Sequence, residues 1–256
     1  MSRLPIVTSL SPVLSDAPHD GAELRLLGAL DLLRVEDAAA VLTQSRRVAL
    51  LAVLAVESPR GFVRRDRLVS LLWPEHDTAS ARGALRKAVH ALRQTLGDDA
   101  LMRRGDEELR LDASRVWCDV AAFDAAHDAG RHARVLELYR GPLLEAFHSG
   151  VHEFSQWLDA ERELRREKAV ASAWALASQL EGAQDLSRAA YWARRVARLA
   201  GTDERRVRAA MGLLARAGNR ADALRIYDDF AAFLQRDFDV TPSAETQAVA
   251  ESLRSS

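Results

Sequence analysis

Residues 78–97 read TASARGALRKAVHALRQTLG, and this stretch carries the strongest signal for the fold. At 3.6 residues per turn, its apolar side chains share one side of a predicted helix: Leu85, Val89, Leu92 and Leu96. Basic residues occupy the outward side: Arg82, Arg86, Lys87, His90 and Arg93. A basic face is most often simply solvated. The neighbouring segments therefore decide what this helix does.

Those neighbouring segments indicate a winged helix-turn-helix. The pattern predicts, in order, strands at 23–27 and 29–35, helices at 45–56 and 65–73, the helix at 78–96, and a hairpin of 101–104 with 109–112. Ser45 and Thr78 are placed to cap the first and third helices, and Gly97 is placed to end the third. Strands, three helices and a closing hairpin together define the winged helix.

In that setting, the third helix is the expected DNA-reading element. A helix fits the major groove of B-DNA, where arginine reads guanine edges and basic side chains grip phosphates. We expect five residues of this helix to contact DNA: Arg82, Arg86, Lys87, His90 and Arg93. The hairpin adds Arg103 and Arg104, which would reach the neighbouring backbone or minor groove. Its tip, residues 105–108, is acidic and would repel phosphate.

From Cys118 onward, the strand pattern gives way to alanine-rich helical periodicity. Leu180, Ala183 and Ala189 recur 34 residues later as Leu214, Ala217 and Ala223, which is the repeat length of tetratricopeptide helix pairs. Two or three degenerate repeats are expected. The fold class is therefore mainly α with a small β component: a disordered tail at 1–21, a winged helix at 22–117 and helical repeats at 118–256.

Composition narrows the function further. The 256 residues carry a formal net charge of −1, so any DNA site must be local. The single cysteine, Cys118, excludes an intramolecular disulfide and fits a reducing compartment. No signal peptide or apolar run of about 20 residues is found, which predicts a cytoplasmic protein without membrane contact.

Catalytic patterns are absent from the sequence. It contains no phosphate-binding loop, nucleophile elbow or dinucleotide turn. His148 and His152 are four residues apart, but Gly150 lies between them and no third ligand is evident. We expect no enzymatic activity, no metal site and no cofactor.

Several stretches of the sequence, taken together, resemble two known domain families. Residues 21–112 resemble the OmpR/PhoB-type winged helix in LRLLG at 24–28, RDRL at 65–68 and SAR at 80–82. Residues 118–253 resemble the bacterial transcriptional activation domain in YRGPLL at 139–144, WLDAERE at 157–163 and ALRIY at 223–227. In this order, the two parts resemble the Streptomyces antibiotic regulatory protein (SARP) family.

This resemblance implies an activator that binds direct repeats near promoters, as a dimer or larger assembly, and recruits RNA polymerase. It also implies a polymerase contact in the link between the second and third helices, where Glu75, His76 and Asp77 stand. Family members often cap the second helix with Ser or Thr, and this chain has Arg64 there. That cap is therefore weakened, and only Asp66 favours the helix start electrostatically.

A second interpretation stays open. The near-neutral first half and the acidic hairpin tip also suit a winged helix that has become a protein-binding module, in a helical-repeat adaptor. Such a protein would show no salt-sensitive affinity for DNA. A repeat domain that senses a small molecule and controls DNA affinity is a further alternative.

Overall fold

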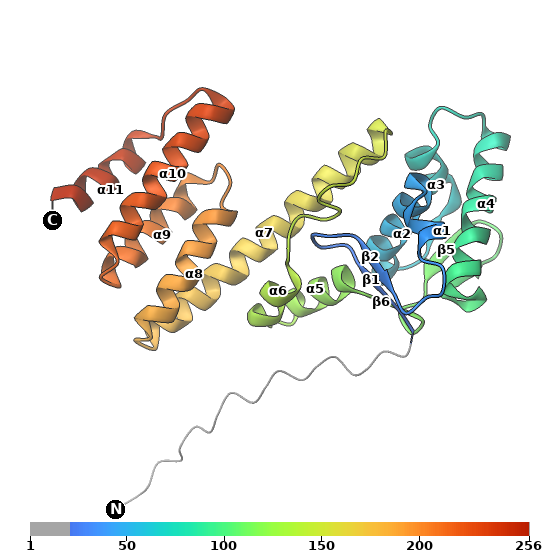
Figure 1. Ribbon diagram of the computed structural model, residues 1–256, viewed down its shortest axis with the longest axis horizontal. Helices are drawn as coiled ribbons and strands as arrows, with labels where there is room; N and C mark the ends of the chain where they lie inside the picture. The colour runs from blue at the N-terminus through green and yellow to red at the C-terminus, as the bar shows by residue number, and fades with distance from the viewer. Residues whose placement is uncertain (1–20, 256) are drawn as a thin grey trace, which may run out of the picture.

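The computed structural model describes residues 21–255 and shows a β-containing part followed by a helical array (Figure 1). The first part comprises β1 (Ala22–Arg25), β2 (Asp31–Leu33), α1 (Ala39–Leu42), α2 (Ser45–Glu57), β3 (Val63–Arg64), α3 (Arg65–Leu72), α4 (Thr78–Leu96), β4 (Leu101–Arg104), β5 (Glu108–Leu111) and β6 (Val116–Cys118). Short 3-10 turns, η1 (Ser58–Arg60) and η2 (Asp98–Ala100), connect some of these elements. Apart from Gly21, the tail predicted for residues 1–21 lies outside the described residues.

The array comprises α5 (Asp119–Asp128), α6 (His132–Leu138), α7 (His152–Gly182), α8 (Leu186–Leu199), α9 (Glu204–Arg216), α10 (Arg220–Phe238) and α11 (Ala244–Ser255). The long helix α7 runs diagonally through the molecule and packs against α3, α6 and α8 (Figure 1). The predicted fold class, mainly α with a small β component, is confirmed. No helix of residues 21–255 is long and apolar enough to cross a membrane.

Two three-stranded sheets frame the first part. In one, β1 pairs antiparallel with β2 and parallel with β6, giving the order β2-β1-β6. In the other, β5 lies between β3 and β4, and the β4–β5 hairpin forms the wing. Because β6 pairs directly with β1, the chain enters α5 beside the first sheet.

Helix α2 is the centre of the first core. All nine residues from 48 to 56 are buried, so this helix must be covered on every side. It packs against α1, α3, α4, α5 and β5. Leu68 and Leu72 of α3, with Leu85 and Leu92 of α4, are fully buried in the same core. This packing fixes α3 and α4 relative to each other.

The sequence pattern predicted most of these elements correctly, but two of the predicted helix caps are wrong. Ser45 is the first residue of α2, and Gln44 is its N-cap without a side-chain hydrogen bond. Thr78 begins α4, and Asp77 caps it. The cap of α3 is Arg64, which makes no side-chain cap bond, as expected. Three elements were not predicted, namely α1, β3 and β6, because two to four residues are too few to show a period.

The two parts are joined through the carboxylate of Asp119 at the start of α5. It accepts hydrogen bonds from the backbone N–H groups of Leu26 (2.9 Å) and Leu27 (3.0 Å), just beyond β1. Burial raises the pKa of Asp119, and these two hydrogen bonds oppose that rise. The neighbouring thiol of Cys118 is also buried, which raises its pKa. This thiol is therefore a packing group.

A second contact lies beside this one. Leu27 and Leu143 form an isolated antiparallel bridge, and the N–H of Gly28 donates to the carbonyl oxygen of Pro142 at 3.0 Å. A Cβ atom on Gly141 would lie 3.0 Å from the Cα of Gly28, which has φ +92°. Only glycine therefore allows the two backbones to approach this closely.

The predicted helical repeat is confirmed, and the structure shows its physical basis. The ends of α5, α7 and α9 have the same turn, in which Arg131, Asp185 and Asn219 donate their N–H groups to carbonyls five residues back, at 2.8–2.9 Å. The residue before each donor has positive φ: Gly130, Gln184 and Gly218. This is the Schellman helix ending, and it returns each following helix along its predecessor. Ala189 and Ala223, which recur in the sequence, are fully buried.

An ion cluster fastens α7 to α5. The guanidinium of Arg165 is completely buried and bonds to Asp124 at 2.8 Å and Glu161 at 2.5 Å. Lys168 also binds Asp124, at 2.6 Å. A buried guanidinium is tolerated only when carboxylates pair with it, so losing either acid would strongly destabilise this contact.

The last helix is held by a carboxylate of α9. Glu204 accepts hydrogen bonds from the N–H of Ser243 at 3.0 Å and from the hydroxyls of Ser243 and Thr246. Burial alone would raise the pKa of Glu204, but the hydrogen bonds from Ser243 and Thr246 leave it below its usual value. The charged form of Glu204 therefore anchors the start of α11.

Asp119→Ala should lower the free energy of unfolding by about 2–4 kcal/mol, because two buried N–H groups lose their acceptor. Urea unfolding followed by circular dichroism measures this loss. The matched control is Asp128→Ala at the exposed end of the same helix, which should change stability by less than roughly 0.5 kcal/mol. Equal losses in the two variants would show that the first sheet does not depend on Asp119.

Glu204→Gln should make stability less sensitive to acid. The folded-state pKa of Glu204 is lowered, so its contribution is present above the ordinary value of 4.5 and is lost as pH falls through the folded-state pKa. Unfolding free energies of wild type and variant should differ by about 1 kcal/mol at neutral pH and converge in acid. Glu251→Gln, at an exposed site on α11, is the control. A gap that stays constant with pH would contradict the assignment.

Candidate nucleic-acid interface

The start of α4 is fixed by Asp77. Its carboxylate accepts hydrogen bonds from the N–H groups of Ala79 and Ser80, each at 3.0 Å, and from the hydroxyl of Ser80 at 2.5 Å. The hydrogen bonds from Ser80 lower the pKa of Asp77. Trp73, at the end of α3, is buried, so the link between the two helices is held at both ends.

The two faces of α4 match the predicted wheel. Leu85, Val89 and Leu92 are buried, and Leu96 is half-buried against the core. Four of the predicted DNA-contacting residues are exposed: Arg82, Arg86, Lys87 and His90. The fifth, Arg93, is half-buried. The helix therefore buries its apolar face in the core and presents a continuous basic surface beside it.

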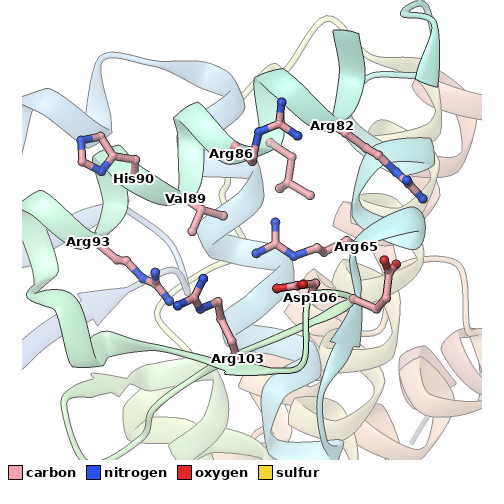
Figure 2. Close-up of a pocket in the computed structure, with 10 residues that line it drawn as sticks. Arg65, Arg82, Arg86, Val89, His90, Arg93, Arg103 and Asp106 are labelled. Atoms are coloured by element: carbon pink, nitrogen blue, oxygen red, sulfur yellow. The ribbon is translucent and has the colours of Figure 1, made fainter. Parts of the chain in front are cut away.

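A groove of about 420 Å³ lies between this surface and the wing (Figure 2). Helix α4 forms one wall, the start of α3 contributes Arg65, and the wing contributes Arg103, Asp106 and Glu107. Its charged lining consists of five arginines and two acids: Arg65, Arg82, Arg86, Arg93, Arg103, Asp106 and Glu107. The groove is thus strongly cationic within a nearly neutral chain.

The basic side chains of α4 differ in how far they are already engaged. Arg82 pairs with Asp66 of α3 at 2.9 Å. Arg93 donates from Nη2 to the carbonyl oxygen of Leu101 at 2.6 Å. Within residues 21–255, three have no hydrogen bond or ion pair: Arg86, Lys87 and His90. Of these, Arg86 and His90 line the groove, while Lys87 is exposed on α4 outside it.

The two wing arginines point to opposite sides of the hairpin because side chains alternate along a strand. Arg103 lines the groove (Figure 2). Arg104 instead pairs with Glu108, and its guanidinium lies 4.8 Å from the centre of the Phe62 ring. The structure therefore brings only one of the two predicted wing residues into the groove.

Sequence reasoning missed Arg65. It is the first residue of α3 and directly follows the wing-paired strand β3, whose partner is β5. Its N–H donates to the carbonyl oxygen of Glu107 at 2.8 Å, which ties the wing turn to α3. The signal in the sequence is the presence of three arginines among residues 64–67, and nothing there shows which arginine turns inward.

The link that the resemblance assigns to polymerase contact is exposed, but its residues also have structural partners. Glu75 pairs with Arg46 of α2 at 2.7 Å. His76 lies 3.5 Å from the same carboxylate. Asp77 is occupied in capping α4. Glu75 and His76 are therefore the members of this link that a partner could reach without unwinding α4.

A winged helix with a basic groove, followed by stacked helix pairs, is the domain arrangement of a class of transcriptional regulators. Residues 111–254 match the family described as the bacterial transcriptional activator domain. The match covers more than half of the chain, and the chain belongs to this family. The resemblance to SARP-type regulators, with a winged helix before that domain, is confirmed.

The fold is shared with a solved structure. It is described as Mycobacterium tuberculosis EmbR in complex with a low-affinity phosphopeptide, and it is 20% identical to this chain with a TM-score of 0.60. The similarity covers 91% of this chain and 65% of that one, so this chain spans just under two thirds of that protein. No curated protein gives a significant sequence match.

Proposed function

We propose that this protein is a DNA-binding transcriptional activator that inserts α4 into the major groove of promoter DNA. The observation that carries this proposal is the groove between α4 and the wing, where five arginines face two acids. Arg86 and His90 stand there without partners among residues 21–255. Unengaged arginine on an exposed helix is the group that reads guanine O6 and N7.

The contacts divide by chemistry. Arg86 and His90 face outward from the middle of α4, where they would meet base edges, and Lys87 would meet the adjacent backbone. Arg82 would exchange Asp66 for a phosphate or a base, since an exposed ion pair is worth little. Arg103 would approach the backbone from the wing.

The resemblance to SARP-type regulators supports a proposal for the assembly on DNA. That resemblance implies binding to direct repeats, so we propose that two copies of this chain sit side by side on promoter DNA. RNA polymerase would then be recruited through the exposed link at Glu75 and His76 and through the helical array. The groove gives no support to catalysis.

The proposal is tested by fluorescence anisotropy with the DNA upstream of the protein's own gene and with scrambled DNA, across a salt series. The upstream DNA should bind roughly a thousandfold more tightly, and log affinity should fall steeply with log salt because phosphates are engaged. If neither DNA binds at low salt, the proposal fails and the winged helix serves a protein partner.

Arg86→Ala should weaken binding to the upstream DNA by roughly 10- to 100-fold and change binding to scrambled DNA little, because a base contact is lost. Arg205→Ala, an exposed arginine on α9, is the matched control and should bind as the wild type does. Circular dichroism checks that both variants fold. An equal loss on both DNAs would place Arg86 on the backbone instead.

A further inference from the structure

Three guanidiniums in the groove come together from three separate elements. Arg65 extends from the start of α3, Arg93 from the last turns of α4 and Arg103 from β4 of the wing. Figure 2 shows their guanidinium ends turned toward one another, with the carboxylate of Asp106 beside them. Backbone pairing of the wing and the bond from the Arg65 N–H to Glu107 bring these elements to one groove, and all three arginines line it.

Two of these side chains have unused, desolvated donors. The Nε atoms of Arg65 and Arg93 are buried and have no hydrogen-bond partner among residues 21–255. Arg93 is nonetheless held in place, since its Nη2 donates to the carbonyl oxygen of Leu101 at 2.6 Å. A buried N–H without an acceptor is unfavourable, so both guanidiniums are under-paired. The Nε atoms are covered by protein, so an oxyanion in the groove would meet the terminal Nη groups of these arginines.

The charges lead to the same conclusion. Burial lowers the pKa of Arg65, and the positive charges of Arg103 and Arg93 lower it further, while Asp106 and Glu107 oppose this. No ion pair joins Asp106 to any of the three arginines within residues 21–255. The like charges are therefore only partly balanced, and a bound anion would relieve the repulsion.

We infer that Arg65, Arg93 and Arg103 form a binding site for one phosphate group, and that the nearby carboxylate of Asp106 opposes the binding of that phosphate. The inference rests on the proposed function: in the DNA complex, the ligand is a backbone phosphate at the edge of the major groove. Guanidiniums bind phosphate oxygens through paired N–H donors, which suits three of them around one tetrahedral anion.

This arrangement explains how the acidic wing tip affects DNA binding. Every phosphate must compete with Asp106, so contacts with the backbone alone are weakened. The wing tip thus lowers affinity for every DNA by a similar factor, so that tight binding also requires the base contacts of Arg86 and His90.

The first test uses inorganic phosphate and the full chain labelled with 15N. Phosphate is added at constant ionic strength against sodium chloride, and the arginine Nε–H resonances are followed by NMR. The signals of Arg65, Arg93 and Arg103 should shift together and saturate, while that of Arg104 should not follow. Asp106→Asn should tighten phosphate binding about threefold. Shifts that do not saturate, or that chloride reproduces, would overturn the site.

The second test identifies the source of the phosphate. In the salt series with DNA, Arg103→Ala should lower the slope of log affinity against log salt by about 1, whereas Arg104→Ala should not. An unchanged slope in a protein that binds DNA would overturn this inference and leave the proposed function standing. Saturable phosphate binding without any DNA binding would instead overturn the proposed function and assign the site to free phosphate.

Discussion

The carboxylate of Asp119 holds two backbone N–H groups at the end of β1, and the arrangement of the whole molecule depends on that contact. It lies where β6 leaves the first sheet and α5 begins, so it fastens the winged helix to the helical array at the point where the chain passes between them. The Gly28–Gly141 approach and the Leu27–Leu143 bridge extend the same contact. The first sheet therefore has a defined orientation relative to the repeats, because it cannot shift without breaking buried hydrogen bonds. The groove belongs to the same part of the chain, since α2 packs against both α4 and α5.

Much of this fold was predictable because the decisive signals are local. The apolar period of α4, the glycine that ends it and the 34-residue recurrence each lie within a short stretch, and the structure places them as expected. Errors arose where a choice between adjacent residues depends on geometry, as for the caps Gln44 and Asp77. The strands β3 and β6 escaped notice because their pairing partners lie far away in the sequence. For the site, the face of α4 was predictable, whereas the inward turn of Arg65 and the outward turn of Arg104 follow from tertiary contacts.

The charge distribution shows how a protein with a net charge of −1 can still attract DNA. Most arginines outside the groove are neutralised by nearby acids, such as Arg165 by Asp124 and Glu161, or Arg216 by Glu181. Such pairs cancel at a distance, since opposite charges a few ångströms apart leave little field beyond the Debye length. The groove is different because five arginines from α3, α4 and β4 line it with only two acids, both from the wing turn, and only Arg82 of the five forms an ion pair among residues 21–255, with Asp66. Local imbalance, and not total charge, is what a DNA backbone would sense.

The length and continuity of helix α7 determine how far apart the two ends of the molecule lie. It is one uninterrupted helix of 31 residues, fastened near its start to α3 and along its length to α6 and α8. At 1.5 Å per residue it acts as a rigid spacer of roughly 45 Å between the groove-bearing end and the distal repeats. The number of residues in α7 sets both the distance between its two ends and their relative rotation, because each added residue would turn the far end by about 100°. The helix thus fixes both the distance and the rotation between the winged-helix part and the helices α9–α11.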